Sequence, residues 1–179
     1  MRKLKNEELG RLSAEDFRTI DKNPVVLVLD NIRSMNNVGA AFRTSDAFLI
    51  EKIYLCGITA KPPHRDINKT ALGATDTVAW EHFEHTLAAI EQLRSEGYHI
   101  LSVEQAENST MLNDFHPSEN QKYAFVFGNE VFGVDQQVID QSDDVIEIPQ
   151  FGSKHSLNIS VSIGIVLWET ISSLPAVKE

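Results

Sequence analysis

Cysteine is nearly absent from this sequence of 179 residues, which holds only Cys56. A single thiol can form neither an internal disulfide nor a cysteine-based zinc cluster. A chain that does not depend on disulfides fits a reducing compartment, so we expect a cytoplasmic protein. His82 and His85 lack an evident third ligand, and we interpret them as ordinary surface residues. The sequence therefore predicts no metal.

Long hydrophobic runs and glycine-rich loops are missing as well. The longest apolar stretches have the length of a strand, and the N-terminus, MRKLKNEELG, carries charge from its second residue. We therefore expect no signal peptide and no membrane association. The nine glycines form no G-x-G-x-x-G and no P-loop. This absence disfavours a Rossmann dehydrogenase and a P-loop kinase.

Basic residues are outnumbered, with 16 Lys and Arg against 26 Asp and Glu and a net charge of −10. A chain with this overall charge repels a polyanion, which argues against nucleic acid. Binding depends on the local face that meets the polymer, however. One short segment, KPPHRDINK (61–69), has an excess of basic residues, and other cations follow in loop-like segments. The candidate RNA-binding residues are Arg33, Lys61, Arg65, Lys69 and Lys154.

Apolar segments alternate with amphipathic ones along a chain whose length suits one domain. The expected strands are residues 24–30, 52–57, 78–83, 98–104, 123–128 and 144–149, and the expected helices are 38–49, 86–97 and 134–142. Strands alternating with helices predict an α/β fold, a parallel sheet with helices on both faces. The first 23 residues are polar, with Ser13 and Asp16 at capping-box spacing. We therefore separate an N-terminal helical extension, 1–23, from a domain at 24–179.

The last segment is ambiguous. Residues 157–165 (LNISVSIGI) alternate apolar and polar, as a strand does, yet Leu157, Val161, Ile165 and Trp168 also form a helical stripe. The length of the segment, which runs to Ile171, favours a helix.

Three polar clusters follow expected strands, and ligands of parallel sheets bind beyond the carboxyl ends of strands. They are NIRSMNNVGAAFRTSDAF (31–48), FVFGNEVFGVD (125–135) and IPQFGSKHSLNISVSIGIVLWE (148–169). In the first, Asn37 lies at the expected helix start, where a capping side chain and open N–H groups suit an anion. In the third, Ser156 is the expected cap of the final helix, with Asn158 facing outward. Each cluster alone also fits a capped helix, a β-turn or a plain loop.

Taken together, the clusters resemble the three motifs of the SpoU/TrmH branch of the SPOUT methyltransferases. The matching patterns are N-x-G-A-x-x-R-T-x-D-A, F-G-N-E-x-x-G-V and I-P-x-x-G-x-x-x-S-L-N-x-S-V-x-x-x-I-x-L-x-E. The likeness covers about residues 24–172, including 57–75 as the second strand-to-helix connection. It implies the SPOUT fold, in which the C-terminal stretch threads a trefoil knot, an exception to the rule against knots. It also implies a helix after the knot.

The resemblance implies S-adenosylmethionine (SAM) as cofactor and a homodimer in which each active site borrows from its partner. Members of the family dimerise through the first and last helices, and the last apolar helix here offers Ile163, Leu167, Trp168 and Ile171. By their position in the motifs, the residues expected to bind SAM are Val103, Gly128, Asn129, Ile148, Gln150 and Leu157.

The implied reaction is methylation of a ribose 2′-hydroxyl in RNA. Arg43 matches the family's catalytic arginine, often proposed as the base, and Asn37 matches the asparagine beside it. Because a guanidinium normally stays charged, we favour a fork that binds the adjacent phosphate and stabilises the developing alkoxide. Ser156 and Asn158 are then expected to position the ribose and the arginine, and Glu130 to orient the site.

The RNA itself is not identified by the sequence. Many relatives carry an N-terminal RNA-binding domain, whereas only about 23 residues precede the first strand here. We expect tRNA as the substrate, with ribosomal RNA as the alternative. A non-catalytic RNA- or SAM-binding module on the same fold is a second hypothesis, favoured by the acidic charge and opposed by the intact motif residues. A small-molecule enzyme on an open α/β sheet is a third.

Overall fold

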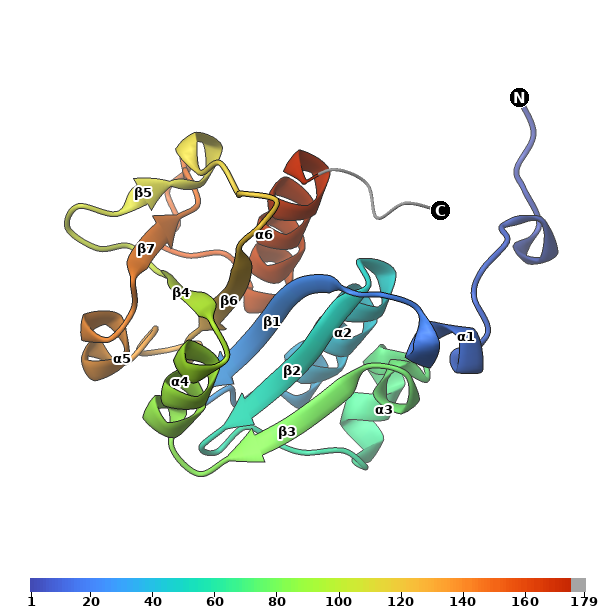
Figure 1. The fold of residues 1–179 in the computed structure, drawn as a ribbon, viewed down its shortest axis with the longest axis horizontal. Coiled ribbons are helices and arrows are strands. Elements are labelled where there is room, and N and C mark those ends of the chain that lie inside the picture. The colour runs from blue at the N-terminus through green and yellow to red at the C-terminus, as the bar shows by residue number, and fades with distance from the viewer. Residues whose placement is uncertain (175–179) are drawn as a thin grey trace.

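The computed structural model describes residues 1–174, apart from the side chain of Asn6. The last five residues of the domain predicted at 24–179 thus lie outside the described residues, and its boundary at residue 24 stays a prediction. Seven parallel strands form one sheet in the order β3-β2-β1-β6-β4-β7-β5 (Figure 1). They are β1 (Asn23–Asp30), β2 (Ile50–Cys56), β3 (Ala79–Phe83), β4 (Tyr98–Val103), β5 (Thr110–Met111), β6 (Lys122–Phe127) and β7 (Asp144–Glu147).

The predicted parallel α/β architecture is confirmed, with one strand more than expected. β5 is only two residues long, and so short a strand carries no periodic pattern that a sequence reading could detect. The other six strands lie within two residues of their predicted bounds. The helices are α1 (Ala14–Thr19), α2 (Met35–Ala47), α3 (Arg65–Ala71), α4 (Thr86–Ser95), α5 (Gln136–Asp140) and α6 (Ile159–Ser173). Short 3-10 turns occupy η1 (Asn6–Glu8), η2 (Ala74–Asp76) and η3 (Leu112–Asp114).

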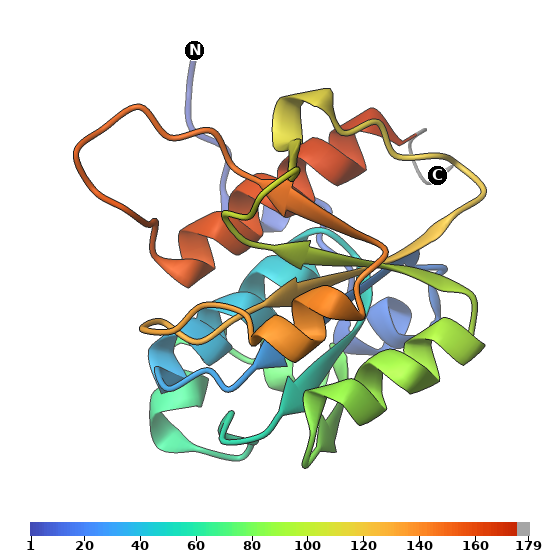
Figure 2. The same ribbon diagram turned by 90° about the vertical axis from the view of Figure 1, so that its left-hand side faces the viewer.

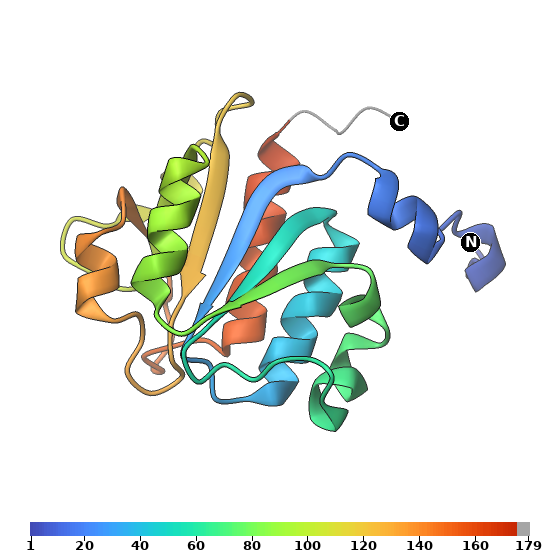
Figure 3. The ribbon, with the colours of Figure 1, turned by 60° about the horizontal axis from the view of Figure 1, so that its bottom comes forward.

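Helices cover both faces of the sheet (Figure 3). The larger hydrophobic cluster joins the sheet to α1, α2, α3 and α6, and the smaller one joins it to α4 and α5. Strand β1 lies between them, since Leu27 points into the first cluster and Val28 into the second, and both are fully buried. Each such side chain contributes about 1.5–3 kcal/mol by leaving water. This explains the unbroken apolar run of β1.

Two helix starts differ from the sequence prediction. Helix α2 begins at Met35, three residues early, because the Ser34 side chain caps it by accepting the N–H of Asn37 at 3.3 Å. Helix α6 is confirmed as a helix, but the expectation that Ser156 caps it was wrong. Asn158 is the cap, and its Oδ1 accepts the Ser160 N–H at 2.9 Å. Capping requires a side chain directly before the first helical turn, and only Asn158 has that position.

The apolar face assigned to α6 as an interface also needs correction. Ile163 and Leu167 are buried in the protein's own core, and Ile171 packs against that core. Trp168 alone of the predicted set is exposed, at 63%. Ile165 and Val161, one and two helical turns before it, are exposed at 36% and 49%. The free apolar stripe is therefore the one that contains Val161, Ile165 and Trp168.

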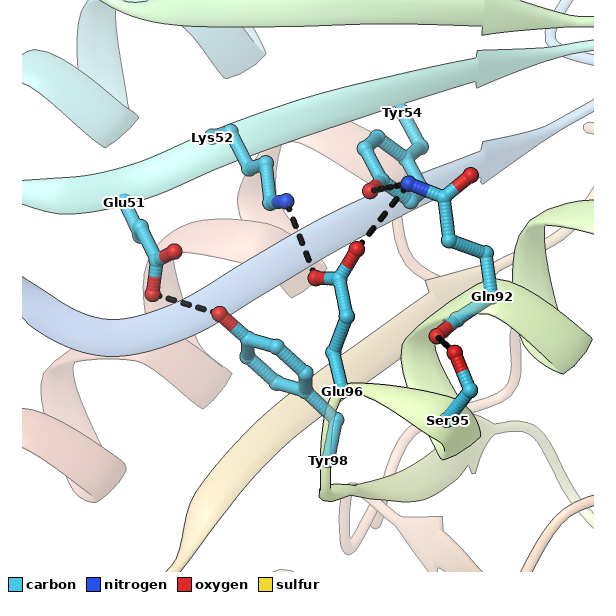
Figure 4. Close-up of polar contacts among 7 residues, drawn as sticks. All are labelled: Glu51, Lys52, Tyr54, Gln92, Ser95, Glu96 and Tyr98. Atoms are coloured by element: carbon cyan, nitrogen blue, oxygen red, sulfur yellow. Dashed lines mark hydrogen bonds and ion pairs between the residues drawn. The ribbon is translucent and has the colours of Figure 1, made fainter.

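A polar network ties α4 to the amino ends of the strands (Figure 4). Lys52 Nζ donates to Glu96 at 3.1 Å, and Gln92 donates to the other oxygen of Glu96 at 3.0 Å. The hydroxyl of Tyr98 donates to Glu51 at 2.5 Å. The network lies at the end of the sheet opposite the loops that follow β4, β6 and β7. It serves the fold and leaves those loops free for ligands.

Helix α1 is a short element held against the domain. The Ser13 cap predicted from the capping-box spacing is confirmed, since its Oγ accepts the Asp16 N–H at 3.1 Å. Phe17 enters the core, and Arg18 donates to the carbonyl oxygen of Asp76 at 2.7 Å. No helix between residues 1 and 174 combines the length and the apolar character that a bilayer crossing requires.

Candidate active site

A pocket of about 760 Å³ opens at the carboxyl ends of β4, β6 and β7. Figure 2 shows the loops after β6 and β7 extending from the same end of the sheet, with the start of α6 beside them. All six residues predicted to bind a cofactor line the pocket: Val103, Gly128, Asn129, Ile148, Gln150 and Leu157. Glu130, Ser156 and Asn158 line it too. Three segments far apart in the sequence thus converge where the fold class predicted a ligand site.

Glu130 is the centre of the hydrogen bonds beside this pocket. Its carboxylate accepts the backbone N–H groups of Arg33 and Ser34, at 2.9 and 3.0 Å, and the side-chain amide of Asn37 at 3.1 Å. Burial alone would raise the pKa of Glu130, but these donors outweigh it and hold that pKa below its ordinary value. Glu130 is therefore an ionised anchor for the start of α2.

Asn158 extends this chain of contacts to the third cluster. Its amide donates to Oδ1 of Asn37 at 3.3 Å, while its own Oδ1 caps α6. Glu130, Asn37 and Asn158 thus form one hydrogen-bonded series that joins the loops after β1, β6 and β7. Because Ser34 has taken the capping role, the Asn37 side chain is free to bridge the other two. Ser156 lies exposed on the pocket wall nearby in the chain.

The loop after β6 is shaped by Asn129 and two glycines. The Asn129 amide donates to the carbonyl oxygen of Asn31 at 2.8 Å, which fixes the loop to the end of β1. The Asn129 and Gly133 backbones exchange two hydrogen bonds, at 2.9 and 2.8 Å. A Cβ at Gly128 would overlap the backbone of Gly133, and Gly133 has φ +71°, which favours glycine. Asn129 therefore shapes the pocket as well as lining it.

The pocket residues that the sequence reading missed include two that connect its loops, Glu104 and Gln105. Glu104 accepts the N–H of Val134 at 3.0 Å, and Gln105 donates to the carbonyl oxygen of His155 at 2.9 Å. They connect the loop after β4 to the loops after β6 and β7. Their position directly after a buried strand could have identified them, because polar residues at that position lie at the edge of the sheet where ligands bind.

Arg43 stands apart from the other predicted catalytic residues. It is exposed on α2, does not line the pocket, and has no hydrogen bond or ion pair among residues 1–174. It follows Asn37 by six positions, and at 100° per residue the two side chains leave the helix in different directions. The chain's own fold therefore does not bring Arg43 to its own pocket.

The predicted RNA-binding residues fall on two surfaces. Arg33 and Lys154 are exposed on the loops beside the pocket, and the Arg33 backbone contacts Glu130. Lys61, Arg65 and Lys69 are exposed on and before α3. Within the described part of the chain, no group of three or more His, Cys, Asp or Glu side chains is placed to hold a metal ion.

Known proteins match this sequence over most of its length. The profile of the SpoU rRNA Methylase family matches residues 24–168. A 23S rRNA (guanosine-2′-O-)-methyltransferase, RlmB, of Neisseria meningitidis is 29% identical over 86% of this chain and 60% of its own length. A tRNA (guanosine(18)-2′-O)-methyltransferase of Borreliella burgdorferi is 28% identical over 96% of this chain and 76% of its own. The chain thus spans well under the full length of the Neisseria relative.

Solved structures share the fold. The A. aeolicus TrmH/SpoU tRNA modifying enzyme superposes with a TM-score of 0.78 at 24% identity, over 89% of this chain and 79% of that one. The AdoMet-bound rRNA methyltransferase of Sinorhizobium meliloti gives 0.79 at 24% identity, over 89% and 61%. The expected fold class is confirmed, and the trefoil knot follows from the fold of these neighbours.

Proposed function

The chain belongs to the SpoU rRNA Methylase family, and from that membership we propose that it transfers a methyl group from SAM to a ribose 2′-hydroxyl of RNA. The observation that carries the proposal is the convergence of all three motif loops. Glu130, Asn37 and Asn158 are joined by hydrogen bonds beside one pocket at the carboxyl edge of the sheet.

The pocket suits SAM in size and in chemistry. Its volume of about 760 Å³ lies in the range of small-molecule sites. Val103, Ile148 and Leu157 offer apolar walls for an adenine, and Glu104 and Gln150 offer polar groups for the methionine part. Gly128 and Asn129 complete the set of residues that would hold the cofactor. SAM supplies an activated methyl group on a sulfonium.

The protein's own residues then have to position the ribose and stabilise charge. In-line transfer demands that the ribose oxygen be aligned with the methyl carbon, and we assign that positioning to Ser156 and Asn158. Glu130 keeps the start of α2 and Asn37 in register with them. As the 2′-hydroxyl releases its proton to water, negative charge grows on its oxygen, and we assign the stabilisation of that charge to the guanidinium of Arg43.

We propose that the active unit is a homodimer. Arg43 is exposed and away from its own pocket, so a second subunit is the simplest source of the arginine for each site. The stripe of Val161, Ile165 and Trp168 on α6 supplies an apolar surface for the contact, and Trp168 stacks edge-on against Phe48, which directly follows α2. The interface then brings α2 of one subunit toward its partner.

We propose that the substrate RNA is tRNA, with ribosomal RNA as the alternative. We also propose that the protein acts in the cytoplasm. Relatives of both kinds match this chain, one named for tRNA and several named for 23S rRNA. Mass spectrometry of nucleosides from separated tRNA and rRNA, with and without the gene, decides between them. One 2′-O-methyl nucleoside is expected to disappear from the tRNA fraction. Its loss from rRNA alone would favour the alternative, and an unchanged set in both fractions would contradict the proposed activity.

A further inference from the structure

A second groove lies at the opposite side of the sheet, by the edge strand β3. It has a volume of about 390 Å³ and is bounded by the loop before α3, by α3, by η2 and by β3. Its walls are Pro62, Pro63, Asn68, Gly73, Thr75, Asp76 and Trp80. None of these residues belongs to the candidate active site, and the proposed reaction leaves the groove unexplained.

Trp80 gives this groove an aromatic wall. The side chain is 36% exposed although it belongs to a strand of the sheet. Trp80 pairs in register with Ile53, whose side chain enters the core under α2 and α3, so the indole lies on that same face. Pro62 and Pro63 add two apolar rings. A partly exposed indole beside proline rings is a surface on which a flat ring can stack.

Basic side chains lie next to groove residues in the chain, before Pro62 and on either side of Asn68. Arg65, Asn68 and Lys69 are exposed and share one face of α3, since they are spaced by three and four residues. Lys61 is exposed directly before Pro62. Lys61, Arg65 and Lys69 outnumber the two local acids, the exposed Asp66 and the groove residue Asp76, whereas the whole chain has a net charge of −10. Cations that track a backbone and an aromatic ring that stacks a base are the two parts of a single-stranded RNA site.

The groove is connected to the active site through helix α2. Gly39 lets α3 approach closely, because a Cβ there would overlap Thr70 Oγ1 and the carbonyl oxygen of Ile67. The Thr70 hydroxyl donates to the carbonyl oxygen of Asn36 at 3.0 Å, next to Asn37. Closely packed helices lie about 8–10 Å apart, so an RNA that reaches Asn37 has α3 within the span of a few nucleotides.

We propose that the Trp80 groove binds one unpaired nucleobase of the RNA substrate, at a nucleotide other than the one methylated. The inference rests on the proposed function and adds a separate anchoring subsite to it. The base stacks on Trp80, and Lys61, Arg65 and Lys69 neutralise the flanking phosphates. The Asp76 carboxylate can accept an exocyclic amine, so the groove favours cytosine, adenine or guanine over uracil.

Affinity of the RNA for Trp80 variants tests the subsite. Trp80→Leu keeps an apolar side chain but removes the stacking surface, and we expect RNA affinity to fall by about 5- to 100-fold. Trp80→Phe keeps an aromatic ring and should stay within about 3-fold of the wild type. Leu87→Ala is the matched control, since Leu87 is similarly exposed, at 38%, on α4 across the sheet. Calorimetry with SAM should give the same affinity for all variants.

Short oligonucleotides test the base directly and cover the case in which Trp80→Leu does not fold. Trp80 and Trp168 are the only tryptophans, so Trp168→Phe leaves Trp80 as the sole indole reporter. Pentacytidylate should quench its fluorescence, pentauridylate more weakly, and an abasic ribose-phosphate pentamer least. Equal quenching by the abasic pentamer, or none by any oligonucleotide, would overturn the subsite and leave the groove to another partner such as a protein segment.

The same samples separate this inference from the proposed function. If the protein binds SAM and methylates RNA, but Trp80→Leu leaves its affinity for RNA unchanged, the subsite alone is removed. Failure of the wild type to bind SAM would remove the proposed function itself.

Discussion

Single side chains carry most of the connection between the motif loops. Glu130 accepts two backbone N–H groups from the loop after β1 and the side-chain amide of Asn37 on α2. Asn158, at the start of α6, donates to the same Asn37 side chain. The residue types and their spacing were visible in the sequence. Their hydrogen-bond partners were not visible, because the capping residue depends on where each helix begins. Ser34 caps α2 in place of Asn37, and Asn158 caps α6 in place of Ser156.

Glu130→Gln should lower the free energy of unfolding by an amount that depends on pH. The donors to Glu130 hold its pKa below the ordinary value of 4.5, so the ionised form stabilises the folded state above that pH. This stabilisation is lost as the pH falls through the folded-state pKa. Because the side chain is exposed, we expect a loss of no more than about 1 kcal/mol at pH 7.

Urea denaturation of wild type and Glu130→Gln at pH 7 and at pH 3 measures this difference in the free energy of unfolding. The gap between the two proteins should narrow at the lower pH. Glu107→Gln is the control, since Glu107 is exposed and its side chain has no hydrogen bond among residues 1–174. A gap that is the same at both pH values would show that the charge of Glu130 is not what anchors α2.

Arg43→Ala should separate chemistry from folding. The side chain is exposed and makes no hydrogen bond or ion pair within the described chain, so the melting temperature and SAM affinity should stay unchanged. Methylation of RNA should fall by about 10²-fold or more, as when a preorganised charge is removed from an active site. Arg43→Lys should restore little, because an ammonium lacks the planar fork. Loss of SAM binding, or near-normal turnover, would remove Arg43 from its assigned role.

Elements of secondary structure were predicted better than their pairing. Each long strand has a continuous apolar run and each longer helix a polar face, and these patterns survive in a single sequence. The two-residue β5 has no such pattern, and its pairing with β7 is set by the tertiary fold. The seven-residue α3 was read only as part of a connection, since KPPHRDINK looks like a polar loop until Ile67 is seen in the core.

The contact between α2 and α3 should depend on Gly39. A Cβ at this position would overlap Thr70 Oγ1 and the backbone oxygen of Ile67, and the Ile67 oxygen cannot move without shifting α3. We expect Gly39→Ala to lower the free energy of unfolding by about 1–3 kcal/mol. Gly152→Ala, with no atom within 4 Å of the added carbon, should change it little. Thermal and urea denaturation of both variants decide the point, and equal stability of the two would contradict the close packing.

The molecule as a whole has an apolar stripe on α6 that its own fold leaves uncovered. Of the apolar residues that the sequence offered for an interface, most proved to serve the core, because a helix that is apolar on several sides does not reveal which side is free. Only the exposure of Val161, Ile165 and Trp168 makes that distinction. The proposed dimer is therefore best tested on these residues.

Ile165→Glu should convert a dimer into a monomer. A charge in the centre of an apolar interface would remain unpaired and desolvated, whereas in the free subunit it faces water. Sedimentation at low micromolar concentration should give twice the chain mass of 20.1 kDa for the wild type and 20.1 kDa for the variant. Leu87→Glu, at an exposed position of α4, should sediment as the wild type. A wild type that is monomeric would remove both the dimer and the shared use of Arg43.

The central claim is that this chain moves a methyl group from SAM to a ribose oxygen of RNA. The most direct measurement incubates the purified protein with SAM labelled in its methyl group and with RNA from cells lacking the gene. The RNA is then digested to nucleosides for mass spectrometry. We expect the label on the ribose of one nucleoside, and we expect Arg43→Ala to transfer it more slowly by about 10²-fold or more. Label on a base, or RNA that stays unlabelled although the protein binds SAM, would contradict it.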